Sequence, residues 1–266
     1  ETPSASRYGR GSHIRNLLRG IREDEKVISI LPMDRSLIEN PEGHFLMFAT
    51  ANGRIKKSKL SEYSRINRNG KYALRFADGD NDNLVAVRPA TDTDHVVLVS
   101  ALGNACRFMP SEKKTRLSPE TGETVTTYVV RVQGRISQGV SGMKLAGDDK
   151  VIGMIVTDDF DTSVLTISKY GMAKRSRLGS GEMMPLSEEG AQIFDELGNP
   201  VLERDGYRKT NRGTKGVRTM SLRDGDQIVS VRQIPDLEDQ LFMLTGSGMM
   251  IRMVSGQTKG TLGKVT

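Results

Sequence analysis

The hydrophobic residues of this chain form short continuous runs, and a glycine and a basic residue follow each run at a fixed distance. In four places a run of mostly apolar residues leads through a few small or polar residues to a glycine, with Lys or Arg four positions after it. The copies are residues 45–48 with Gly53 and Lys57, 96–99 with Gly103 and Arg107, 164–167 with Gly171 and Arg175, and 241–244 with Gly248 and Arg252. An internal repeat of this kind predicts an array of equivalent units.

Each run predicts a β-hairpin. The runs are short, contain many β-branched and aromatic residues, and lead through the glycine into a second extended stretch, such as residues 54–57. Because the runs are continuous rather than alternating, we expect strands that are covered on both faces. Bulky residues precede the glycine in two copies, Leu102 and Tyr170. A two-residue type I′ turn would place them at positive φ, so we predict type I turns with a glycine bulge there.

A second recurring piece precedes each hairpin. It starts at a glycine with basic or amide neighbours and continues through an extended stretch and an acidic turn to another β run. The β runs are residues 27–30, 84–87, 151–154 and 228–231. About four strands per unit predict an all-β fold of propeller-like blades.

The spacing of the hairpins indicates one domain over residues 1–266 with two insertions. We place the repeats near 9–63, 64–110, 130–178 and 207–258, and the insertions at 111–129 and 179–206. We expect a short helix at residues 186–194 of the second insertion. Residues 258–260 resemble the start of a fifth unit, so the chain is expected to be cut within the array at both ends.

Composition adds a moderate positive charge. The chain has 39 Lys+Arg against 33 Asp+Glu, a net charge of +6 and a pI near 9.4, which fits a polyanionic partner. It has no apolar run of membrane-spanning length and no signal sequence, so no membrane partner is expected. Cys106 is the only cysteine, which favours a reducing, cytoplasmic setting and a small core residue.

Motifs for catalysis and cofactors fail on inspection. Residues 78–83 begin like a calcium loop, but Asn83 and Pro89 stand where glycine and glutamate are required. Residues 134–139 have the glycine spacing of an ATP-binding loop, but Val140 replaces the lysine. The three histidines lack metal-ligand spacing and are expected at the surface or at strand ends. We therefore expect no cofactor, no metal and no enzyme activity of this chain alone.

The basic positions carry the functional hypothesis. If rotation relates the units, Lys57, Arg107, Arg175 and Arg252 form a belt around the perimeter that matches a curved phosphate backbone. Basic loops that alternate glycine with Lys or Arg extend this belt. The candidate DNA-binding residues are Arg54, Lys56, Lys57, Lys59, Arg65, Arg68, Lys71, Arg107, Arg135, Lys174, Arg175, Arg208, Lys209, Arg212, Lys215, Arg218 and Arg252.

Several stretches resemble the C-terminal DNA-wrapping domain of the DNA gyrase A subunit and, more distantly, its topoisomerase IV counterpart. They are residues 48–63 (FATANGRIKKSKLSEY), 138–143 (QGVSGM) with 151–154 (VIGM), and 170–175 (YGMAKR). The likeness covers nearly the whole chain except residues 179–206. It implies a β-pinwheel, a propeller-like disc of about four to six blades that exchange strands, with duplex DNA around its rim.

The resemblance also implies a role and partners. The chain would be a non-catalytic, DNA-bending module of an ATP-dependent type IIA topoisomerase, with double-stranded DNA, the parent enzyme's N-terminal cleavage region and the gyrase B subunit as partners. The family's basic box has its nearest likeness at residues 210–216, and we expect the unit that normally carries the box to lie outside this chain. A propeller that binds another protein, a topoisomerase IV parent and single-strand binding remain alternatives, the last disfavoured by the scarcity of aromatic residues.

Overall fold

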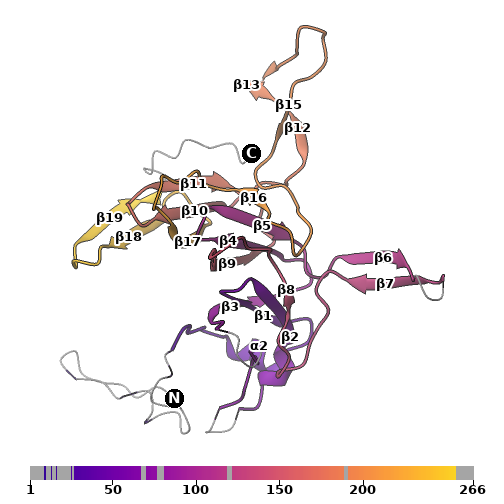
Figure 1. The fold of residues 1–266 in the computed structure, drawn as a ribbon, viewed down its shortest axis with the longest axis vertical. Helices are drawn as coiled ribbons and strands as arrows, with labels where there is room; N and C mark the ends of the chain where they lie inside the picture. Colours follow the sequence, from indigo (N-terminus) through magenta and orange to yellow (C-terminus); the bar gives the residue numbers. More distant parts are fainter. Residues whose placement is uncertain are drawn as a thin grey trace.

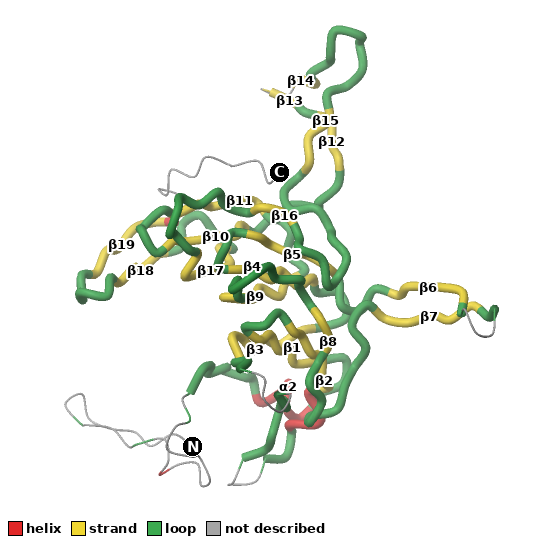
Figure 2. Tube along the Cα trace, in the orientation of Figure 1, coloured by secondary structure: helices red, strands yellow, loops and turns green. Residues whose placement is uncertain are grey.

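The computed structural model describes residues 9, 13, 16, 25, 27–66, 70–76, 81–118, 122–188 and 191–255. In this part of the chain the protein is built almost entirely of strands and loops, as predicted (Figures 1 and 2). The described residues include two short helices, α2 (Arg35–Glu39) and the 3-10 helix η1 (Leu60–Tyr63). None of these helices is long or apolar enough to cross a membrane.

The strands group into three interlocked blades, a fourth hairpin and two projecting hairpins. The first blade has the order β3 (Leu84–Ala90), β1 (Phe45–Thr50), β2 (Arg54–Lys59), β8 (Val140–Ser141). The second has β9 (Val151–Thr157), β4 (His95–Ser100), β5 (Asn104–Phe108), β16 (Val217–Arg218). The third has β17 (Ile228–Ile234), β10 (Ser163–Ser168), β11 (Ala173–Arg177), and the fourth hairpin is β18 (Gln240–Leu244) with β19 (Met250–Val254).

The first two blades each take strands from three successive repeats, and the third takes strands from two. The hairpin β1–β2 pairs on its inner side with β3, which belongs to the next repeat, and on its outer side with β8, which belongs to the repeat after that. The second blade repeats the pattern with β9 and β16. This exchange confirms the predicted pinwheel and explains why a repeat in the sequence is not a blade in space.

The hairpin runs are covered on both faces, as their continuous apolar sequence predicts. All six residues of β4 are buried. Val96 and Leu98 pack into one hydrophobic cluster, whereas Val97 and Val99 pack into the next. Cys106 is fully buried in the first of these clusters, as expected for a small core residue.

The hairpin turns share one hydrogen-bond pattern. The amide of each turn glycine donates to the carbonyl three residues earlier, for example Gly103 N to Ser100 O at 3.1 Å, and Gly103 has φ +88°. This geometry agrees with the predicted glycine bulge. The acidic turns brace these loops, because Asp82, Asp149 and Asp226 each accept a hydrogen bond from a turn amide of the hairpin before them.

The two insertions form hairpins that project from the body (Figures 1 and 2). The first arm consists of β6 (Lys113–Leu117) and β7 (Thr124–Tyr128). The second arm consists of β12 (Met183–Pro185) with β15 (Leu202–Arg204) and β13 (Ser187–Glu188) with β14 (Ala191–Gln192). The expected helix at 186–194 is wrong, since this stretch lies in a β-ribbon where Ser187 pairs with Gln192.

The first and last repeats are less complete than the others. Residues 27–30 were expected to form a strand, but they have no regular structure and Ile30 is 85% exposed. The equivalent run of each later repeat pairs with the hairpin before it, and the described residues contain no strand before Phe45. β18 and β19 pair only with each other, so Phe242 and Leu244 are exposed. The proposed fifth repeat at 258–260 lies outside the described residues.

Candidate nucleic-acid interface

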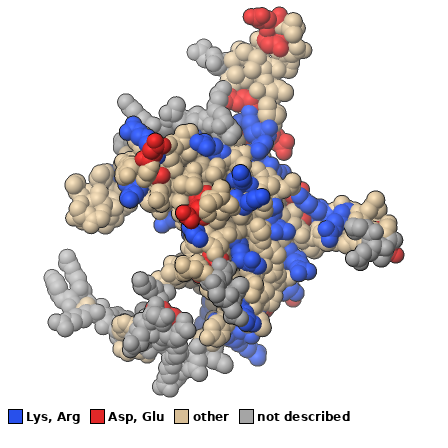
Figure 3. Space-filling view, in the orientation of Figure 1, with Lys and Arg blue, Asp and Glu red and all other residues tan. Residues whose placement is uncertain are grey.

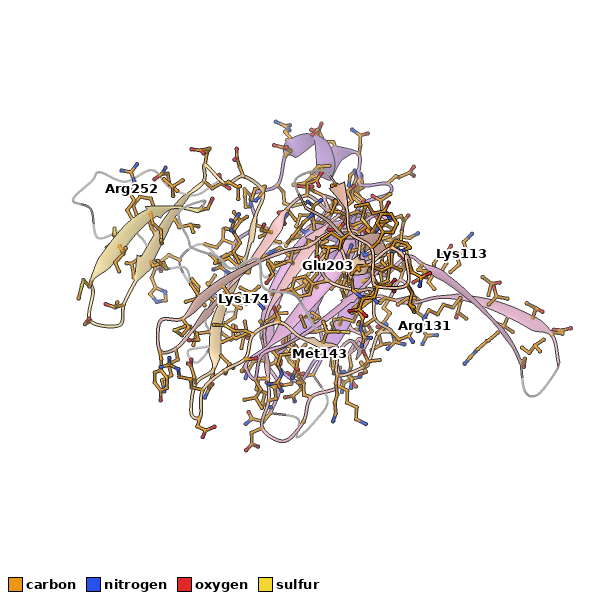
Figure 4. The ribbon with its side chains drawn as sticks, turned by 90° about the horizontal axis from the view of Figure 1, so that it is seen from above. Lys113, Arg131, Met143, Lys174, Glu203 and Arg252 are labelled. Carbon is orange, nitrogen blue, oxygen red and sulfur yellow. The ribbon has the colours of Figure 1, made fainter. Side chains whose placement is uncertain are left out.

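The four equivalent basic positions do not form an exposed belt. Lys57 and Arg107 are only 3% and 1% exposed, and Arg175 is half-buried with its Nε enclosed and unpartnered among the described residues. Arg252 is exposed, but it lies on β19, at the opposite end of the molecule from Lys113 (Figure 4). The prediction of a shared outer edge for these residues is therefore wrong.

Arg107 is an internal clamp. Its Nη1 donates to the carbonyls of Leu178, Gly179 and Tyr207 at 3.1, 2.8 and 2.7 Å, and its guanidinium lies 4.8 Å from the ring centre of Phe160. Burial lowers the pKa of Arg107 to about 10, although Asp205 and Glu182 oppose the shift. The side chain therefore remains charged at neutral pH and holds the root of the second arm.

His95 shares this buried site. It begins β4, a strand end as expected, yet it is only 3% exposed, and its Nδ1 accepts a hydrogen bond from Arg107 Nε at 3.3 Å. Burial, with contributions from the nearby charges of Arg107 and Lys209, lowers the pKa of His95 to about 4. His95 is thus neutral at physiological pH.

Other predicted site residues also bind main-chain carbonyls. Lys56 is fully buried and donates to the carbonyls of Ala73 and Arg135, and burial lowers its pKa to about 8. Lys174 donates to Thr219 O at 2.8 Å, and burial lowers its pKa as well. Arg54 and Arg212 are only partly exposed. Arg54 bonds to the carbonyls of Gln138 and Gly139, and Arg212 bonds to those of Val129 and Ser141.

The strand exchange explains why these cations are covered. Two outer segments, residues 129–144 and 207–220, each come from a later repeat and cross the hairpin strands β2 and β5. The crossing is so close that a Cβ on Gly139 would lie 2.4 Å from Ile55 O, and one on Gly216 would lie 2.1 Å from Ala105 O. A hairpin considered alone leaves its basic strand at the edge of the blade, whereas the folded chain adds another segment outside it.

The predicted residues therefore divide by exposure. Lys56, Lys57 and Arg107 are buried; Arg54, Arg135, Lys174, Arg175 and Arg212 are partly exposed; Lys59, Arg65, Lys71, Arg208, Lys209, Lys215, Arg218 and Arg252 are exposed; Arg68 lies outside the described residues.

The outer segments bring one group of exposed cations together. Lys144 N donates to Thr214 O at 2.9 Å, which ties the two segments to each other, and neither segment contains an Asp or Glu. Figure 3 shows Lys and Arg gathered along this edge between the two arms. We call this group the outer strip; its members are Arg131, Lys144, Arg208, Lys209, Lys215 and Arg218.

Sequence reasoning missed Arg131 and Lys144. Their signal is the absence of acidic residues around them, because residues 129–144 hold three cations and no carboxylate.

The described residues contain no cluster of His, Cys, Asp or Glu that could hold a metal ion. What the geometry does bring together is a group of exposed Lys and Arg along one edge (Figure 3).

The comparison with family models decides the relationship of the chain. The model described as the C-terminal, beta-propeller domain of DNA gyrase matches residues 3–32, 44–91, 124–158 and 202–235. The chain belongs to the DNA gyrase C-terminal domain family.

Relatives and structures agree with membership of the gyrase family. The chain is 29% identical to the DNA gyrase A subunit of Rickettsia prowazekii over 94% of its length, and 31% identical to that of Salmonella typhimurium over 95%. It spans only 28% and 23% of those two proteins. The crystal structure of the C-terminal domain of DNA topoisomerase IV superposes with a TM-score of 0.68 at 19% identity, covering 94% of this chain and 63% of that one. That likeness confirms the fold.

Proposed function

We propose that this gyrase-family chain binds double-stranded DNA along the outer strip and bends it around the curved edge, without catalysing a reaction itself. The observation that carries the proposal is the segregation of charge. Residues 129–144 and 207–220 contribute eight Lys and Arg and no Asp or Glu to one edge. The acidic residues Asp82, Asp149 and Asp226 are instead used inside the fold to brace hairpin turns.

A rigid curved edge suits a bent duplex. Bending a site of 20–30 base pairs by 40–90° costs roughly 1–6 kcal/mol. Several phosphate contacts that are fixed in space can offset this, and the clamps described above fix them, because Arg54, Arg107 and Arg212 hold the backbone of the outer segments. Contacts to phosphates carry no base preference, so binding should be largely independent of sequence.

In the parent protein this surface would present DNA to the other parts of the enzyme. The relatives are A subunits of DNA gyrase, and we infer that the chain is part of an ATP-dependent type IIA topoisomerase in the cytoplasm, acting with the N-terminal cleavage region and the gyrase B subunit. Within that assembly, bending on the outer strip would guide a duplex for strand passage.

The test compares DNA binding by a variant that lacks four positive charges of the outer strip with binding by a variant that lacks four positive charges elsewhere on the surface. In the strip variant, Arg208, Lys209, Lys215 and Arg218 are changed to Ser. The matched control changes four exposed cations outside the strip to Ser, namely Arg35, Lys169, Arg223 and Arg232. We expect the strip variant to flatten the dependence of log K on log[salt] by about 3 to 4, because each phosphate contact contributes about 0.9.

Circularisation of short duplexes measures bending in the same samples. The strip variant should lose the acceleration of ring closure, and the control should keep most of it. Equal salt slopes and equal ring closure in the two variants would refute the outer strip as the DNA surface.

A further inference from the structure

We propose that the first arm, β6–β7, is a second DNA-binding element, a basic ribbon that grips the duplex in a groove as it passes the outer strip. The inference rests on the proposed function, since it needs DNA on that edge, and it concerns residues outside the predicted site. β6, which carries the arm's three basic strand residues, also lies outside the segments that the gyrase family model matches.

The arm has no core of its own. All ten residues of β6 and β7 are exposed, including Leu117 at 69% and Tyr128 at 51%. An isolated two-stranded hairpin is only marginally stable in water. This ribbon is ordered by a full antiparallel ladder with many β-branched residues and by its root, where Val130 is 1% exposed within the first hydrophobic cluster. A ribbon that projects with both faces bare is suited to contact a partner.

Its charge favours a polyanion. β6 contributes Lys113, Lys114 and Arg116, and neither strand contains a carboxylate. The glutamates of this insertion lie before or between the paired strands, so the paired part of the ribbon is the basic part. Lys114 and Arg116 lie on one face together with Thr127 and Val125. Threonine hydroxyls and basic side chains are common donors to phosphate oxygens.

The arm is tied to the outer strip. Lys114 Nζ donates to Asn211 Oδ1 at 2.5 Å, which joins its basic face to the segment that carries Arg208 and Lys209. Lys113 and Arg131 lie at the root of the projecting ribbon (Figure 4). A hollow at this root is lined by Lys57, Lys59, Lys113 and Tyr128 among others. A duplex on the strip therefore passes within reach of the arm.

The dimensions fit a groove of DNA. Five paired residues extend roughly 17 Å along the ribbon. The major groove is about 12 Å wide and 8.5 Å deep and admits a two-stranded ribbon, whereas ribbons with apolar tips enter the minor groove in bending proteins. The exposed Leu117 and Val125 near the outer end are consistent with either groove.

The second arm is a built-in contrast. It leaves the body at the equivalent place in the next repeat, after β11 and before β16, as the first arm leaves after β5 and before β8. Residues 179–206 contain seven Asp and Glu and one Arg, so this hairpin would be repelled by DNA. Residues 111–129 of the first arm hold three Lys or Arg and three Glu, so they are neutral overall, with the basic residues placed on β6. The two hairpins thus project alike but differ by six charges, which makes the second arm a comparison for the effect of charge.

The first experiment changes only the charge of the ribbon. Lys113→Ser, Lys114→Ser and Arg116→Ser are combined, and the control combines Glu196→Gln and Glu203→Gln in the second arm. With a short mixed-sequence duplex, the first variant should weaken binding about tenfold or more at 0.1 M salt and flatten the salt slope by about 2 to 3. The control should bind as tightly as the wild-type chain or more tightly.

The second experiment maps the contact. Because Cys106 is the only cysteine and is fully buried, Thr126→Cys on the first arm and Gln192→Cys on the second can each carry a DNA-cleaving reagent. Cleavage from position 126 and not from position 192 is expected.

The outcomes separate the two proposals. Wild-type affinity and slope in the triple Ser variant, or no cleavage from position 126, would overturn the ribbon as a DNA element while the strip variant still shows its own loss. If the wild-type chain fails to bind duplex DNA at all, the proposed function itself falls. Unchanged thermal unfolding of the triple variant would verify that its loss of affinity is not a loss of fold.

Discussion

Arg107 Nη1 donates to the carbonyl of Gly179 at 2.8 Å, so the second hairpin holds the root of the insertion that follows the third. The same guanidinium reaches Tyr207, where the insertion returns to the body. Similar links join Lys56 to Arg135 O and Lys174 to Thr219 O. Arg107, Lys56 and Lys174 thus bind the protein backbone, and the segments they hold carry cations that face solvent.

Arg107 and Arg218 should show opposite effects. Arg107→Met leaves three buried carbonyls without their charged donor, which should lower the free energy of unfolding by roughly 3 kcal/mol. Arg218 is exposed, so Arg218→Met should change stability by less than about 0.5 kcal/mol. Urea denaturation measures both.

The effects of the same two substitutions on DNA binding should be the reverse of their effects on stability. The salt slope of folded Arg107→Met should match that of the wild-type chain, whereas Arg218→Met should flatten it by about 1. A stable Arg107→Met protein with a weakened salt slope would show that Arg107 contacts DNA and not only the fold.

Gly216 is expected to be irreplaceable for steric reasons. It has φ +75°, and a Cβ would lie 2.1 Å from Ala105 O, where the outer segment crosses β5. Gly216→Ala should cost at least about 3 kcal/mol, since the left-handed conformation alone costs about 1–2 kcal/mol and the clash adds to it.

Gly147 supplies the control for this glycine. It has φ +57°, but a Cβ added there would meet no atom within 4 Å, so Gly147→Ala should cost only about 1–2 kcal/mol. Equal shifts of the denaturation midpoint in the two variants would show that the close crossing does not constrain the chain.

These examples show which features the sequence could reveal. The continuous runs, the glycine bulges and the all-β blades follow from local rules, because apolar pattern and turn chemistry act over a few residues. The burial of Lys57 and Arg107 does not follow from local rules. It depends on which segment lies outside β2 and β5, and that segment comes from two repeats later in the chain. The failed helix at 186–194 has a similar origin. Its residues pair across a ribbon, and no local pattern records that partner.

His95 should make the protein sensitive to mild acid. Its pKa is about 4 in the folded chain and near 6.5 when unfolded, so the unfolded state binds the extra proton first as the pH falls. The contribution of neutral His95 to the free energy of unfolding is fully present above about pH 6.5 and is lost as the pH falls towards 4. The loss is at most about 3 kcal/mol. Denaturation midpoints at a series of pH values should show this loss.

His95→Gln isolates this effect. Glutamine can still accept the hydrogen bond from Arg107 Nε, but it does not titrate. The variant should keep a nearly constant stability between pH 6.5 and 4.5, while the wild-type chain declines. Parallel pH profiles would mean that other groups cause the acid sensitivity.

Shortening the acidic second arm should strengthen DNA binding. Pro185 pairs with Leu202, so residues 186–201 can be replaced by an Asn-Gly turn. This removes four carboxylates and no basic residue. Because the arm adjoins the outer strip, losing its negative charge should raise affinity for duplex DNA about two- to tenfold at low salt, and the gain should vanish near 1 M salt, where the Debye length is about 3 Å. Titrations across salt concentrations measure the gain, and a loss of affinity at low salt would assign the second arm to the DNA contact after all.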